Sequence, residues 1–172
     1  MDHINTADTI MGIGLTYDNQ GKYDEAITQY ERALRIKEKA FGVDHINTAD
    51  TINNLGLTYH NQGKYDEAIT QYERALRIKE KAFGVDHIHT APIIMNMGLL
   101  FKVKGQNELA RSKLLRSYQI YVSNFGELHP STQKALSNLQ VGWEEDSREY
   151  HRGEQHLLSK PIWKRRLKKL FS

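Results

Sequence analysis

Apolar residues recur at the spacing of an amphipathic helix in two successive runs within residues 44–85. Asn47, followed three residues later by Asp50, resembles a capping box at the start of the first run. The second run opens at residues 64–65 and ends at Gly84, a residue type typical of helix C-terminal caps. The pattern therefore predicts two antiparallel helices, whose apolar stripes are Ile52, Leu55, Gly56 and Tyr59, then Ala68, Ile69, Tyr72, Ala75, Leu76, Ala82 and Phe83.

This two-helix pattern occurs three times with a period of 42 residues. Residues 2–43 and 44–85 are identical at 38 of 42 positions, and residues 86–127 keep the register with many more changes. A period of this length indicates stacked repeats, each of which buries its apolar faces against its neighbours. The first two copies differ at four pairs of positions: Met11 and Asn53, Gly12 and Asn54, Ile13 and Leu55, and Asp18 and His60.

A fourth unit begins near His129 and supplies a single helix, predicted over residues 131–143. Because a repeat array needs a terminal cap, we expect this helix to end the array. Residues 1–146 are then three repeats with a capping helix, and residues 147–172 are a linker and a tail. The side chains predicted to pack backwards onto the third repeat are Leu136, Leu139 and Trp143.

The recurring positions carry a family resemblance. In the second copy, the set Ile52, Leu55, Gly56, Tyr59, Ala68, Tyr72 and Ala75 resembles the tetratricopeptide signature. The 42-residue period and the histidine that opens each unit are similar to the kinesin light chain subclass of these repeats. The resemblance implies an all-α, right-handed α-solenoid of antiparallel helix pairs with a C-terminal capping helix. It also implies a non-enzymatic module that binds other proteins.

Composition agrees with such a module and leaves little for catalysis. The 172 residues include no cysteine, which excludes disulfides, thiolate zinc sites and cysteine nucleophiles. The chain has neither a phosphate-binding glycine loop nor an apolar run of membrane-spanning length, and it begins without a secretory signal. Histidines at the repeat period are interpreted as loop or cap residues, because successive repeats stand too far apart to share one zinc ion. We expect a cytoplasmic protein with no cofactor and no metal.

The resemblance implies that residues of the first helix in each pair line a concave groove for a peptide or helix of a partner. Three of the four differences between the near-identical copies fall on this surface, which indicates either divergence toward a bound peptide or drift at solvated positions. The fourth, Ile13 against Leu55, is interpreted as a core exchange of equal volume. The expected groove residues are Asp8, Met11, Leu15, Asp18, Asp50, Asn53, Asn54, Leu57, His60, Met95, Asn96, Leu99 and Lys102.

Charge along this surface favours one class of partner. It runs from acidic, at Asp8, Asp18 and Asp50, to weakly basic at Lys102. A partner with basic and apolar residues therefore fits better than a tryptophan-acidic cargo peptide. The acidic C-termini of chaperones are also disfavoured, because Met11 and other uncharged residues stand where the chaperone-binding relatives use Lys, Asn and Arg.

A basic segment ends the sequence: residues 160–172 carry six basic residues and no acidic ones. At helical spacing, apolar residues of this tail fall on one arc and most basic residues lie opposite. An alternative function is therefore a regulatory or sensor fragment of a larger protein, whose tail binds an anionic membrane or a calmodulin-like groove. A solvated terminus without a partner and docking onto the acidic groove also stay open, whereas nucleic-acid binding is disfavoured. The tail residues are Trp163, Lys164, Arg165, Arg166, Lys168 and Lys169.

Overall fold

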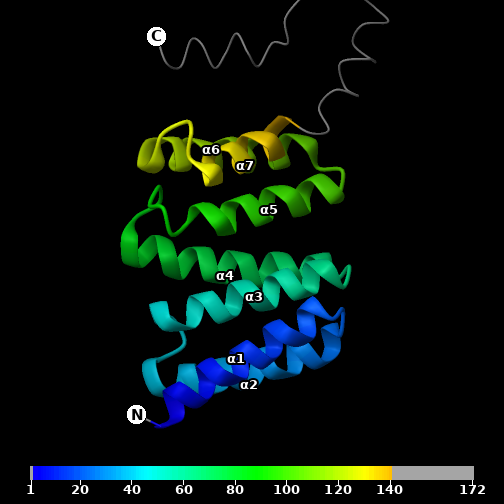
Figure 1. The fold of residues 1–172 in the computed structure, drawn as a ribbon, viewed down its shortest axis with the longest axis vertical. Helices are drawn as coiled ribbons and strands as arrows, with labels where there is room; N and C mark the ends of the chain where they lie inside the picture. The colour runs from blue at the N-terminus through cyan, green and yellow to red at the C-terminus, as the bar shows by residue number, and fades with distance from the viewer. Residues whose placement is uncertain (1, 141–172) are drawn as a thin grey trace, which may run out of the picture. The chain divides into compact units, whose positions relative to one another are not determined.

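The computed structural model describes the backbone of residues 2–140 and the side chains of residues 5–140, and over this range it is helical throughout, with turns between the helices. Each of the three repeats contributes a first and a second helix, and a seventh helix follows (Figure 1). The helices are α1 (Asp2–Asn19), α2 (Tyr23–Phe41), α3 (Ile46–Asn61), α4 (Tyr65–Phe83), α5 (Ala91–Val103), α6 (Asn107–Phe125) and α7 (Pro130–Gln140).

Consecutive helices pack against one another in chain order from α1 to α6. The first helices also touch directly, α1 with α3 and α3 with α5, so they form one continuous layer. Figure 1 shows the helix pairs stacked in sequence order, from blue to yellow. The compact unit spans Met1–Leu139. Trp143 and the basic tail residues, on which several sequence predictions fall, lie outside the described residues.

Within each pair, a glycine on the first helix admits a large side chain from the second. A Cβ added to Gly56 would lie 2.9 Å from the ring of Tyr72, which is fully buried, and Gly14 stands in the same relation to Tyr30. In the third repeat Leu114 fills this position against Gly98. The two helices therefore approach closely at each of these glycines, as predicted. The atoms that lie against each glycine belong to the tyrosine or leucine side chain of the second helix.

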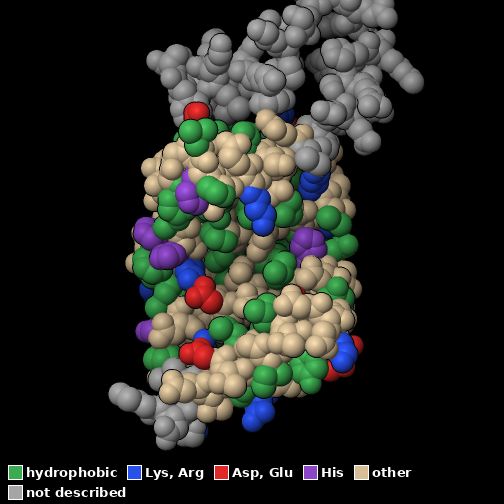
Figure 2. Space-filling view, viewed as in Figure 1, with side chains coloured by type: hydrophobic (Ala, Val, Ile, Leu, Met, Phe, Trp, Pro, Cys, Tyr) green, Lys and Arg blue, Asp and Glu red, His purple; other side chains and the backbone are tan. Residues whose placement is uncertain are grey.

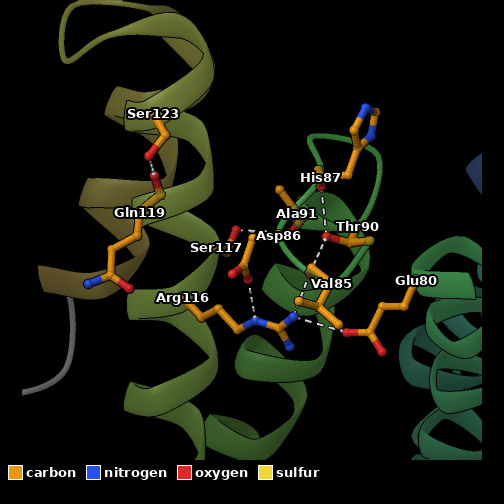
Figure 3. A network of polar contacts seen from close by, with 10 residues as sticks. All are labelled: Glu80, Val85, Asp86, His87, Thr90, Ala91, Arg116, Ser117, Gln119 and Ser123. Carbon is orange, nitrogen blue, oxygen red and sulfur yellow. Dashed lines mark hydrogen bonds and ion pairs between the residues drawn. The ribbon is translucent and has the colours of Figure 1, made fainter. Parts of the chain in front are cut away.

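Between repeats, an arginine of the second helix reaches back to the preceding repeat. Arg74 Nη2 donates to Glu38 Oε1 at 2.6 Å and to the Val43 carbonyl at 2.8 Å. One repeat later, Arg116 donates to Glu80 Oε1 at 3.0 Å, to the Val85 carbonyl and to Asp86 Oδ1. Figure 3 shows Arg116 reaching from α6 toward α4 and the following loop. These guanidinium contacts fix each repeat on the one before it.

A histidine caps the start of α3, which corrects the prediction of a capping box at Asn47. The helix α3 begins at Ile46, and the N-cap residue His45 accepts a hydrogen bond at Nδ1 from the Asn47 amide. Asn47 is thus the donor, because the imidazole already stands where a capping side chain acts. The same contact recurs at His87 and His129, with the amides of His89 and Ser131. His45, His87 and His129 are therefore cap or turn residues, whereas His3 lies within α1.

Three predicted core positions are exposed: Ala82, Phe83 and Ile13. Phe83, expected on the apolar stripe, is 41% exposed and stacks on His87 at the repeat boundary. Ile13 is 43% exposed although its counterpart Leu55 is 4% exposed, so the two residues are not a core exchange of equal volume. Leu55 packs with Ala26 and Tyr30 of the first repeat, and no repeat covers Ile13 in the described part of the chain.

The last described helix is close to the predicted capping helix. It begins at Pro130, one residue before the predicted start, and is described as far as Gln140. Thr132, Ala135 and Leu139 are buried along one face, whereas Leu136 is half-buried. The periodicity of the fourth unit therefore located this helix, although Trp143 lies outside the described residues.

Candidate interaction surface on the first helices

The groove residues predicted from sequence lie on the three first helices α1, α3 and α5, and we call this set the first-helix face. Asp8, Leu15 and Asp50 are exposed and the remaining members are half-buried, so all of them are accessible to a partner. Figure 2 shows acidic side chains on the molecule's visible face, among hydrophobic side chains, with histidines toward its edges. By helix, the set is Asp8, Met11, Leu15 and Asp18 on α1; Asp50, Asn53, Asn54, Leu57 and His60 on α3; and Met95, Asn96, Leu99 and Lys102 on α5.

Two carboxylates of this face are held by lysines from the second helices. Lys37 Nζ lies 2.8 Å from Asp8 Oδ1, and Lys79 Nζ lies 2.8 Å from Asp50 Oδ1. Both lysine side chains are buried, while both aspartates stay more than half exposed. A buried ammonium needs a partner because desolvation is costly. The two buried lysines therefore partly neutralise the negative charge expected at this end of the first-helix face.

These lysines were not among the residues predicted from the sequence, although the repeat register contains a signal for them. The third repeat carries Tyr121 at the register of the lysines and Pro92 at the register of the aspartates. Both members of the pair are thus replaced together, which is the pattern expected of residues in contact. Comparison of paired replacements across the three copies would have found the interaction.

Met11 is a structural contact as well as an accessible residue. Thr51 on α3 donates to Met11 Sδ at 3.4 Å, and Lys37 Nζ lies 3.9 Å from the same sulfur. Met11 therefore links α1, α2 and α3. In the third repeat, Met95 Sδ accepts a hydrogen bond at 3.4 Å from the side-chain amide of Asn138 on α7. The sulfur atoms serve as weak, adaptable acceptors between neighbouring helices.

Three buried polar atoms on this face have no hydrogen-bond partner in the described part of the chain: Asp18 Oδ1, Asn53 Oδ1 and His60 Nδ1. Burial lowers the pKa of His60, which favours the neutral imidazole. Burial and then the Asp18 charge raise the pKa of Tyr30 to about 12 and also raise the pKa of Tyr72. Since buried polar atoms usually have partners, these three side chains keep unused hydrogen-bonding capacity.

Asparagines recur along the face at the repeat period. Asn54, Asn96 and Asn138 occupy equivalent positions on α3, α5 and α7, and all three are half-buried. Within the described residues the side chains of Asn54 and Asn96 make no hydrogen bond, whereas Asn138 contacts Met95. A primary amide both donates and accepts, as a peptide backbone does. Asn138 was not among the predicted residues, although one further step of 42 residues reaches it.

The described residues hold no group of three or more His, Asp or Glu side chains that could bind a metal ion. The rings of His87 and His89 lie 4.9 Å apart and both pack against the ring of Phe83. Among the helices of residues 2–140, none is long and apolar enough to cross a membrane.

Comparison of the sequence with family models finds the tetratricopeptide repeat, matched over residues 4–81. No curated protein matches the sequence. Among solved structures, a putative kinesin light chain of Podosopora anserina with nearly identical TPR-like repeats superposes with a TM-score of 0.75 at 19% identity, covering 86% of this chain and 70% of that one. This similarity confirms the expected all-α repeat solenoid.

Two further structures share the fold. BtubC (BKLC) from P. vanneervenii superposes with a TM-score of 0.65 at 21% identity, covering 91% of this chain and 68% of that one. The type III secretion translocator chaperone SycD of Yersinia enterocolitica gives a TM-score of 0.64 at 16% identity, covering 83% of this chain and 95% of that one. At identities this low, the likeness establishes the fold alone. The binding partners of the matched proteins are not carried over to this chain.

Proposed function

We propose that this chain, whose residues 4–81 match the tetratricopeptide repeat family, is of the kinesin light chain-like type and binds an extended peptide of a partner protein across its first-helix face. The fold is that of a protein-interaction module. The observation that carries the finer proposal is the pair of free side-chain amides, Asn54 and Asn96, one repeat apart on adjacent first helices. Each can hold one peptide unit of an extended segment by donating to its carbonyl and accepting from its amide.

Charge and hydrogen-bonding capacity select the side chains of that peptide. Among the side chains with unpartnered buried atoms, Asp18 Oδ1 and Asn53 Oδ1 are acceptors, so they favour donors. Among charged side chains, lysine and arginine have donors alone. Exposed Leu15 and half-buried Leu57 and Leu99 lie on the same face and suit apolar neighbours in the peptide. We therefore assign the ligand as a segment with both basic and apolar residues.

A peptide library tests this proposal. Full-length protein is passed over immobilised ten-residue peptides in three classes: basic with apolar, acidic with apolar, and neutral. Selection of the basic class supports the proposal, and Asp18→Asn should weaken that selection because it removes a negative charge with little change of shape. Lys39→Gln is the matched control, since Lys39 is exposed on α2 away from this face. Preference for acidic peptides, or binding unaffected by Asp18→Asn, would contradict it.

The basic tail supports a second, separate proposal that rests on sequence alone. Residues 160–172 carry six positive charges and lie outside the described residues. We propose that they add attraction to an anionic surface, at roughly 1 kcal/mol per charge near such a surface. Removal of residues 160–172 should then abolish sedimentation with vesicles that contain phosphatidylserine. Equal sedimentation of the truncated chain would contradict a membrane role, and a calmodulin-like protein would then be the next partner to test.

A further inference from the structure

The helices that form the first-helix face, with α7 as the first helix of the fourth unit, sort their charged residues by sign. The sequences of α1 and α3 contain aspartate but no Glu, Lys or Arg. The reverse holds for α5 and α7, which contain one lysine each, Lys102 and Lys134, and no Asp or Glu. In Figure 2, acidic side chains near the middle of the visible face lie at the level of α1 to α3, and basic side chains lie higher, at the level of α5 to α7. The charge on these helices therefore changes from negative to positive along the array.

Two rows of equivalent positions, 42 residues apart along the chain, carry this change of charge. One row lies near the starts of the helices and the other near their ends. Adjacent helices of the face touch, because α1 contacts α3, α3 contacts α5, and Asn138 on α7 bonds to Met95 on α5. Both rows run in the same direction, from acidic on α1 to basic on α5 or α7. By row, the residues are Asp8, Asp50, Pro92 and Lys134 near the helix starts, and Asp18, His60 and Lys102 near the helix ends.

Ion pairs within the protein decide which of these charges act on a bound peptide. The buried lysines of the second helices largely neutralise Asp8 and Asp50. Asp18 forms no ion pair within the described residues, and neither does Lys134, which is exposed. Between them, burial lowers the pKa of His60, so this side chain is neutral at pH 7. The uncompensated charges therefore lie at the two ends of the face, negative at Asp18 and positive at Lys134.

The positions between the two rows are uncharged and set the scale of the ligand. They include the asparagines Asn54 and Asn96 and the half-buried leucines Leu57 and Leu99. Neighbouring helices lie about 8–10 Å apart, and an extended peptide rises about 3.3 Å per residue. One step along the array therefore corresponds to about three peptide residues. Peptide residues over α1 and over α5 are then about six positions apart, and they meet opposite charges.

We propose that the first-helix face fixes the order of charges in its peptide ligand. A basic residue of the peptide lies over α1, and an acidic residue about six or more positions away lies over α5 and α7. Apolar residues between them pack against Leu57 and Leu99. The inference rests on the proposed peptide binding and adds to it the acidic residue and the end of the array that each charge meets. Complementary charges of this kind set the register of a ligand and exclude wrong partners.

Three ten-residue peptides, titrated into the full chain by calorimetry, test the order of charges. The first has basic residues at one end, apolar residues in the middle and acidic residues at the other end. The second has the same composition with the charges interleaved, and the third carries glutamine in place of the acidic residues. The first should bind about two- to fivefold more tightly than each of the others, as expected of exposed charge pairs. Equal affinity for the first and second peptides would overturn the inference.

The third peptide separates this inference from the proposed function. Binding of the third peptide with no gain for the first would leave the proposed function standing and overturn the inference. Failure of all three peptides to bind would overturn both. Lys134→Gln should weaken the first peptide by about two- to fivefold and leave the third unchanged, since Lys134 meets the acidic end alone. Lys39→Gln removes the same charge from an exposed position on α2 and should change neither. Equal effects of Lys134→Gln on the first and third peptides would overturn the inference.

A nitroxide label on the basic end of the first peptide shows where that end lies. In nitrogen-15 spectra of the full chain, the label should broaden backbone amides of α1 near Asp18 and leave those of α7 sharp. A label on the acidic end should do the opposite. Broadening of α7 by the basic end, or equal broadening of α1 and α7 by both ends, would show that the face does not order the charges of its ligand.

Discussion

Lys37 Nζ lies 2.8 Å from Asp8 Oδ1, which joins a buried ammonium on a second helix to an exposed carboxylate on a first helix. Lys79 and Asp50 repeat the contact at the same distance one repeat later. Each pair positions a carboxylate on the first-helix face and reduces the net negative charge of that face. The third repeat, with Tyr121 and Pro92 at these registers, has no such carboxylate.

Asp8→Asn should therefore destabilise the fold by about 1–2 kcal/mol, because Lys37 would be left buried with no negative partner. The expected loss is smaller than for a fully buried pair, since Asp8 is exposed and water can approach the ammonium. Lys37→Met should cost less than Asp8→Asn, because it removes the buried charge itself. Urea unfolding of the two variants and the double variant measures the difference. A larger loss for Lys37→Met would show that the lysine stem, and not the charge, is what matters.

Gly56→Ala should destabilise the chain by about 1–3 kcal/mol, since its Cβ would lie 2.9 Å from the buried ring of Tyr72. Gly12→Ala is the matched control, because no atom lies within 4 Å of a Cβ at that position. The control should stabilise α1 by up to about 1 kcal/mol through helix propensity. Thermal unfolding followed by circular dichroism compares the two variants. Equal midpoints would contradict the close contact between α3 and α4.

Acid should destabilise the chain in part through His60. Burial lowers the His60 pKa below its ordinary 6.5, so the unfolded chain binds this proton more readily than the folded chain. Stability from this group is complete above pH 6.5 and is lost as pH falls through the folded-state pKa. His60→Gln should therefore reduce the loss of stability between pH 7.5 and pH 5, as measured by urea unfolding at each pH. An unchanged pH profile would show that protonation of His60 is not opposed by the fold.

The helix pairs could be predicted from sequence because their determinants are local and repeated. The spacing of Leu55, Gly56, Tyr59 and Tyr72 defines both helices, and three copies average out accidental matches. The starts of the helices were harder to predict, because the imidazole nitrogen of His45 caps α3 and the side chain of Asn47 does not. The family resemblance added the identity of the fold, which the comparisons confirm.

The burial of a residue within the array could not be predicted from the sequence of one repeat alone. Ile13 and Leu55 occupy the same register, yet only Leu55 has a preceding repeat to bury it. Lys37 looks like a solvated helix residue in sequence, but the stacking of α2 against α1 and α3 buries its stem. The first-helix positions were placed on the correct helices. Which of their polar atoms remain unpartnered depends on side-chain geometry that periodicity does not contain.

The central proposal is that Asn54 and Asn96 hold the backbone of a basic and apolar peptide. Loss of both amides should weaken binding of the selected peptide by about tenfold or more, at about 0.5–1.5 kcal/mol for each hydrogen bond. Asn47→Ala is a control on α3, the helix that carries Asn54, and should leave binding unchanged. Asn47 is exposed at the end of α3 opposite to His60.

The most direct test is a titration of the full chain with that peptide, in which nitrogen-15 spectra follow the side-chain amides of Asn54 and Asn96. We predict shifts of both amides, together with backbone shifts at Asp18 and His60 and none at Lys39 or Lys81 on the second helices. Shifts that map to the second helices, with the amides of Asn54 and Asn96 unmoved at saturation, would contradict binding on the first-helix face.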